Sequence, residues 1–164
     1  MNATPPDTAP RYDPYLVDIK ALIRLFIIGF ATGVVGWLFY MAISQFFIEP
    51  VFCRSAETFG VCRNGGTIAW VSAHIVVLAA ATAALARLGV YRPLLIVLGV
   101  LVSLWAAHSW LGGLEWYVSL LWQGFLFGIA VALFGWIARI PNFVIAVLAT
   151  VGAALLARVV LMLV

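Results

Sequence analysis

The chain has 164 residues, of which 66% are hydrophobic and only 9% are charged, and its formal net charge is +3. A soluble domain carries about 25% charged residues, so this composition excludes an ordinary globular domain and indicates an integral membrane protein. It also excludes a nucleic-acid-binding surface, because the few basic residues form no stripe and are better suited to orienting the chain in a bilayer.

The chain divides into a short polar tail and one long apolar domain. Residues 1–12 are polar and rich in proline, which predicts a disordered cytoplasmic tail, and residues 13–164 are expected to form a single transmembrane domain. A spanning helix needs about 20 apolar residues. Five segments meet this requirement: 25–47, 67–88, 94–111, 116–138 and 143–164. The sequence therefore predicts an all-α fold, a compact bundle of five transmembrane helices.

Lysine and arginine predict how this bundle lies in the membrane. With the N-terminus in the cytoplasm, six of the nine basic residues fall on the inner side, namely Arg11, Lys20, Arg24, Arg87, Arg92 and Arg139. Cytoplasmic loops carry an excess of Lys and Arg, so the count indicates an N-in/C-out orientation in the inner membrane of a bacterium.

The outer loop 48–66 holds both cysteines, Cys53 and Cys62. In the predicted orientation this loop is periplasmic or extracellular, where disulfides form and persist. Eight residues separate the two thiols, a spacing that a loop containing glycine can close, so a disulfide is expected. Two free thiols or a metal site are the alternatives, although zinc sites use a second pair of ligands that is absent here.

Polar side chains gather in the outer half of the predicted bundle, where every helix contributes at least one. Each is costly inside a bilayer and therefore marks a site or a helix contact. If they face one another, they form a polar pocket open to the outside. The candidate residues are His74, His108, Glu115, Gln123 and Arg158.

These five residues also have a simpler interpretation. Arg158 and Glu115 lie near the interface, where they can pair with each other or reach the water separately. His74 and Gln123 lie deeper, which favours interhelical hydrogen bonds or a binding site.

The two histidines suggest one sharper hypothesis. His74 and His108 lie at similar depth on consecutive antiparallel helices, which is the geometry of a bis-histidine haem or a metal pair. Neither has a second ligand three or four residues away, so packing with a neutral imidazole is favoured, and no cofactor is expected.

Small residues recur at four-residue spacing on two helices. Gly29 and Gly33 form one such pair, and Gly124 and Gly128 form the other. This spacing lets helix backbones approach closely. Packing inside the bundle is the first interpretation, and docking of a partner membrane protein or self-association is the second.

Four tryptophans are expected to mark the interfaces of the membrane. Trp70, Trp110 and Trp116 fall near the predicted outer boundary, and Trp136 falls near the inner one. Tryptophan is enriched at both boundaries, so these residues are interpreted as an aromatic belt.

Known catalytic motifs are missing from the sequence. It contains no glycine-rich phosphate loop, no plausible Ser/His/Asp set and no His-Glu-x-x-His motif. The pattern favours a non-catalytic accessory, assembly or lipid-binding subunit. A homo-oligomeric transporter or channel for small solutes is the alternative, and a haem- or quinone-linked redox protein is the third hypothesis.

Overall fold

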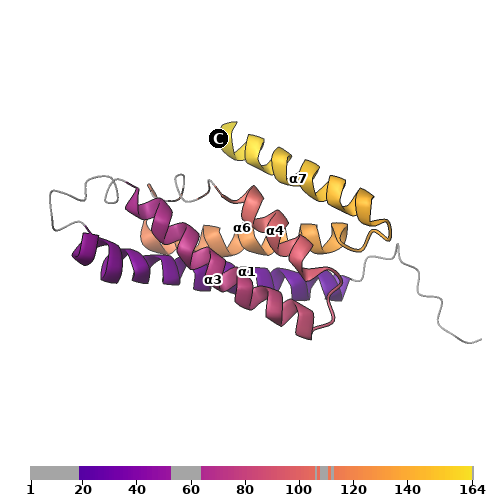
Figure 1. The fold of residues 1–164 in the computed structure, drawn as a ribbon, viewed down its shortest axis with the longest axis horizontal. Coiled ribbons are helices and arrows are strands. Elements are labelled where there is room, and N and C mark those ends of the chain that lie inside the picture. Colours follow the sequence, from indigo (N-terminus) through magenta and orange to yellow (C-terminus); the bar gives the residue numbers. More distant parts are fainter. Residues whose placement is uncertain (1–18, 53–63, 106, 108–110, 112, 164) are drawn as a thin grey trace, which may run out of the picture.

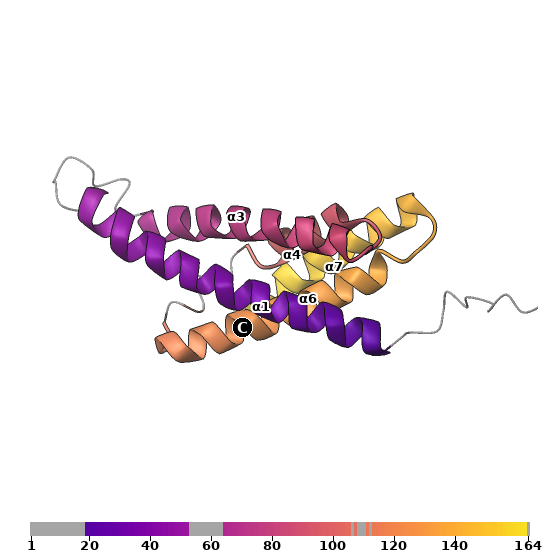
Figure 2. The same ribbon diagram turned by 90° about the horizontal axis from the view of Figure 1, so that it is seen from below.

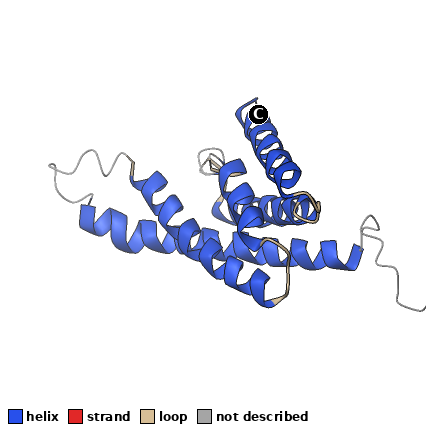
Figure 3. Ribbon diagram, turned by 45° about the vertical axis from the view of Figure 1, so that its right-hand side comes forward, coloured by secondary structure: helices blue, strands red, loops and turns tan. Residues whose placement is uncertain are grey.

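The computed structural model describes residues 19–52, 64–105, 107, 111 and 113–163. Within these residues the chain is helical and contains no strand (Figure 3). The expected tail, 1–12, and the two cysteines, Cys53 and Cys62, lie outside the described residues. The disulfide therefore stays a prediction.

Four helices in the described part are long and apolar enough to cross a membrane. They are α1 (Ile19–Ile43), which continues into η1 (Ser44–Phe52), and then α3 (Gly65–Arg87), α6 (Trp116–Ile137) and α7 (Phe143–Leu163). The bounds of α3, α6 and α7 agree with three of the expected spans to within two residues.

The first helix is longer than expected. It begins by Ile19 and passes without a break into η1, a π-helix that ends at Phe52, so the expected loop starts later than residue 48. Pro50 lies inside η1. Proline has no backbone N–H to donate and crowds the preceding turn of a helix, and it is found here in a π-helix, which is wider than an α-helix. Ile48 is buried against Gly65 at the start of α3, so this extension packs on its neighbour.

The expected span over 94–111 is not one continuous helix. Its first part forms α4 (Pro93–Ser103), which is about 16 Å long at 1.5 Å per residue, while the hydrocarbon core of a bilayer is about 30 Å thick. Leu104 and Trp105 then form a turn. The carbonyl of Val100 accepts both the last helical bond of α4, from the Leu104 amide, and a bond from the buried Ser103 hydroxyl, each at 3.0 Å.

The helices are arranged around a crossing of α1 and α6. Figure 2 shows this crossing, with α3 running beside α1, and Figure 1 shows α7 on the far side of α4 from α1. The start of α1, the α3–α4 turn and the α6–α7 turn share one end of the bundle, which we call the basic end because Arg24, Arg87, Arg92 and Arg139 lie there. Helix α6 begins at the opposite end (Figure 1), so the chain crosses the bundle between the start of α4 and the start of α6.

Two glycines of α1 bring its backbone into contact with α6. A Cβ atom added to Gly33 would lie 2.6 Å from the carbonyl oxygen of Gln123, and one added to Gly29 would lie 2.6 Å from that of Phe127. Real Cβ atoms do not approach backbone oxygens this closely. The two helices can therefore pack at this distance only because both positions are glycine.

The glycines of α6 form the matching half of this contact. The Cα of Gly124 would lie 2.9 Å from a Cβ on Gly33, and Gly128 has the same relation to Gly29. The rings of Phe30 and Phe26 of α1 pack against Gly124 and Gly128 of α6, respectively. All four glycines predicted to pack helices thus meet each other within this chain.

Two turns close the basic end. Helix α3 ends in a Schellman motif, in which Gly89 has a φ of 69° and the Val90 amide donates to the carbonyl of Leu85 at 3.0 Å. Pro93 then opens α4 at a position where its missing N–H is not needed. At the second turn, the side-chain oxygen of Asn142 accepts a bond from the Val144 amide at 3.0 Å and so caps the start of α7.

The side chain of Arg92 joins these two turns. Its guanidinium donates to the carbonyl oxygens of Ile140 at 3.2 Å and Pro141 at 3.3 Å. It also lies over the rings of Tyr91 and Phe143, at 4.5 and 5.0 Å from their centroids. Arg92 therefore fixes the position of the α6–α7 turn relative to the α3–α4 turn.

The substitution Gly33→Ala tests the close approach of α1 and α6. The added methyl group would meet the Gln123 backbone, which cannot rotate away, so we expect a loss of about 1–3 kcal/mol in the free energy of unfolding in mixed micelles. Gly152→Ala is the matched control, because no atom lies within 4 Å of that position on α7. Equal stability of the two variants would contradict the packing described above.

Candidate functional site

The deepest polar residues meet in a pair that links α3 to α6. The side-chain nitrogen of Gln123, Nε2, lies 2.9 Å from Nε2 of the His74 imidazole. Both side chains are completely buried. Along the helix axes, His74 lies about 13 Å from the start of α3 and Gln123 about 10 Å from the start of α6.

The partners of His74 assign its tautomer. Nδ1 lies 2.8 Å from the carbonyl oxygen of Trp70, which can only accept, so Nδ1 carries the proton. In a neutral imidazole Nε2 is then the acceptor, and the amide group of Gln123 donates to it. Both ring nitrogens are therefore engaged, and neither is free to ligate a metal in this arrangement.

Aromatic rings and one glycine enclose the imidazole. The Trp70 ring stacks on it at a centroid distance of 4.1 Å and an angle of 25°, and the Phe127 ring lies at 5.2 Å. On the α1 side, a Cβ on Gly36 would lie 3.0 Å from His74 Nε2, so the ring packs tightly against this glycine. The pair thus lies at the contact of α1, α3 and α6.

The pair does not satisfy all of its polar atoms. The side-chain oxygen of Gln123 is buried and has no hydrogen-bond partner among the described residues. An unmet buried acceptor costs free energy, so the pair contributes less to stability than a fully bonded network would.

The structure separates the other members of the predicted outer cluster from this pair. Glu115 is exposed at the N-cap position of α6 and makes no capping bond with its side chain. Arg158 is half-buried on α7, and the structure shows no ion pair between Glu115 and Arg158, although both are described. His108 lies outside the described residues. Only His74 and Gln123 are seen to meet.

One tryptophan expected in the aromatic belt is in the core instead. Trp70 is completely buried, because it lies one helical turn before His74 on the face that packs against α1 and α6. The belt interpretation is wrong for this residue. Trp116 and Trp136 are 59% and 52% exposed, and their place in a belt stays a prediction; Trp110 lies outside the described residues.

Sequence reasoning missed two contributors to this centre. Trp70 lies four residues before His74 and therefore shares a helix face with it. This signal was overlooked because Trp70 was interpreted as an interfacial residue. Gly36 follows Gly33 by three residues and turns the small face of α1 toward α3. Another buried polar residue, Ser119, donates to the carbonyl of Leu111 at 2.8 Å and is structural.

Two cavities in the described part of the chain lie on α1 and α6 toward the basic end. The larger has a volume of about 410 Å³ and is bordered by Arg24 of α1 and Arg139, directly after α6. A second, apolar groove of about 370 Å³ lies on the same two helices, between Phe26 and Trp136. The described residues contain no group of three or more metal-ligating side chains.

Comparisons with protein-family models, with curated proteins and with solved structures find no match for this chain.

A double-mutant cycle tests the contact between the two buried side chains. His74→Phe and Gln123→Leu each leave one polar partner unbonded, so we expect each to lower the free energy of unfolding by about 1–2 kcal/mol. The double variant should lose less than the sum, with a coupling energy of about 0.5–2 kcal/mol, the range for hydrogen bonds between membrane helices. Additive losses would show that the two side chains do not interact.

Proposed function

We propose that this protein is a non-catalytic, multi-pass membrane protein that acts through its surfaces, as an accessory or lipid-binding subunit. The observation that carries the proposal is the closed centre of the bundle. His74 and Gln123, the polar residues best placed to bind a solute, are bonded to each other and completely buried. Their role is then to hold α3 to α6.

The same geometry weighs against the two alternatives. A transporter needs a path for its solute through the bundle, whereas the rings of Trp70 and Phe127 pack directly against the imidazole. A bis-histidine haem needs a free ring nitrogen, and both nitrogens of His74 already have partners.

The charge distribution supports five passes with the N-terminus in the cytoplasm. Of the six basic side chains among the described residues, five lie at the basic end and the sixth, Arg158, lies near the end of α7, while the two acidic side chains lie at the end opposite the basic one. They are Lys20, Arg24, Arg87, Arg92 and Arg139 at the basic end, and Glu49 and Glu115 opposite. The positive-inside rule then makes the basic end cytoplasmic, and the loop with Cys53 and Cys62 periplasmic.

The surfaces open to partners differ from those that small residues suggested. Gly29, Gly33, Gly124 and Gly128 are covered within the chain and cannot receive a partner helix. The exposed surface of α7 is instead formed by large apolar side chains such as Leu148 and Leu156, at 66% and 68% exposure. Lipid or a partner helix would cover this surface.

Isolation of the protein in a mild detergent tests the proposed function. We expect bound lipids or a partner membrane protein to be found by mass spectrometry, and the same set with the double variant His74→Phe/Gln123→Leu, because the pair is internal. Transport of a solute into vesicles by the wild type, lost in a folded double variant, would contradict the proposal.

Thiol labelling tests the orientation. If the loop is periplasmic and bridged, a membrane-impermeant maleimide added outside should label Cys53 and Cys62 only after reduction. Cys53→Ser should leave Cys62 reactive from outside without a reductant. Labelling of either thiol only from the cytoplasmic side would reverse the orientation.

A further inference from the structure

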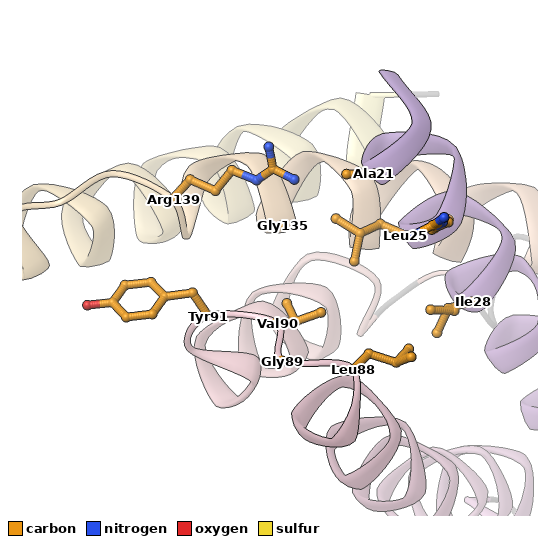
Figure 4. A pocket seen from close by; sticks show the side chains of 10 residues that line it. Ala21, Leu25, Ile28, Leu88, Gly89, Val90, Tyr91, Gly135 and Arg139 are labelled. Atoms are coloured by element: carbon orange, nitrogen blue, oxygen red, sulfur yellow. The ribbon is translucent and has the colours of Figure 1, made fainter. Parts of the chain in front are cut away.

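The cavity at the basic end combines charge with apolar surface. Three parts of the chain border it: the start of α1, the α3–α4 turn and the end of α6 (Figure 4). Leu25, Ile28, Leu88 and Val90 provide its apolar wall. At about 410 Å³ it has the volume of a site for a small ligand or for part of a larger one.

Two arginines at this cavity have unused hydrogen-bond donors. The guanidinium groups of Arg24 and Arg139 make no hydrogen bond or ion pair with any described residue, whereas the nearby Arg92 donates to two carbonyls. The described residues of the basic end include no carboxylate that would neutralise them. Among the described residues, these two guanidinium groups are therefore available to an anionic ligand.

The chemistry of the guanidinium specifies the kind of anion. Arginine presents a planar set of donors that matches phosphate oxygens, and it retains its charge at all physiological pH values. The neighbouring side chains Leu25 and Ile28 are apolar, so a ligand that fits the whole cavity has a charged head and an apolar body. A phospholipid has both, whereas inorganic phosphate would leave the apolar wall uncovered.

The position of the cavity agrees with this ligand. It lies at the level where α1 and α6 reach the basic end, and the apolar groove beside Phe26 and Trp136 is on the same two helices. Basic pockets between membrane helices on the cytoplasmic side suit anionic head groups, which are abundant in that leaflet.

We propose that this cavity binds the phosphate head group of an anionic phospholipid through Arg24 and Arg139. This inference rests on the proposed function, in that it assumes a membrane protein whose basic end is cytoplasmic. It names the ligand class of one surface of that protein.

Titration of the full-length protein with phosphatidylglycerol or with phosphatidylcholine in detergent, followed by native mass spectrometry, tests the inference. We expect the wild type to prefer phosphatidylglycerol. An arginine at the membrane surface is worth about fivefold in affinity, so Arg24→Gln/Arg139→Gln should weaken phosphatidylglycerol binding by about tenfold or more. Arg87→Gln is the matched control, because Arg87 is exposed at the same end but does not line the cavity.

A second variant separates the cavity from simple attraction between charges. Ala21→Trp keeps both arginines but fills the cavity that Ala21 borders, so it should also weaken phosphatidylglycerol binding. It decides the question if the double arginine variant does not fold. Equal affinity for the two lipids, an equal effect of Arg87→Gln, or complete displacement by millimolar inorganic phosphate would overturn the inference. These results would not change the outcome of the co-isolation experiment, which tests the proposed function. The inference and the proposed function can therefore fail independently of each other.

Discussion

The close approach of α1 and α6 is the contact on which the rest of the structure depends. In a bilayer, helices gain nothing by leaving apolar surroundings, so they associate through van der Waals contact and hydrogen bonds. Gly29 and Gly33 face Gly128 and Gly124 and allow backbone contact over two helical turns. Gly36 continues this small face by one more turn and makes space for His74 of α3. One stripe of glycine on α1 thus positions both of its neighbours.

The buried pair follows from this packing and directs attention to the surface of the protein. Because α1 lies so close, the imidazole of His74 is confined between Trp70 and Phe127 and presents Nε2 to Gln123. A polar pair enclosed in this way links helices through its own hydrogen bond. Two groups with unused donors, Arg24 and Arg139, border the cavity at the basic end.

The sequence allowed some parts of this structure to be predicted, and the reasons are local. Helices α3, α6 and α7 follow from long apolar runs bounded by Gly89, Pro93 and Asn142, and the glycine contact follows from four-residue spacing. The end of α4 was missed because its break depends on a single turn after Ser103, within an apolar run. The cavity was missed because a count of arginines indicates only the orientation of the chain. It does not show which guanidinium groups bond within the fold, as that of Arg92 does, and which do not.

The central claim is that the polar pair closes the centre of the bundle, and the ¹⁵N spectrum of the His74 imidazole in lipid bilayers tests it most directly. A variant with His108 replaced by asparagine leaves His74 as the only histidine. The structure predicts a neutral ring with the proton on Nδ1 and an unprotonated Nε2 that accepts from Gln123. A ring protonated on Nε2, or an imidazolium in exchange with water, would contradict a closed centre.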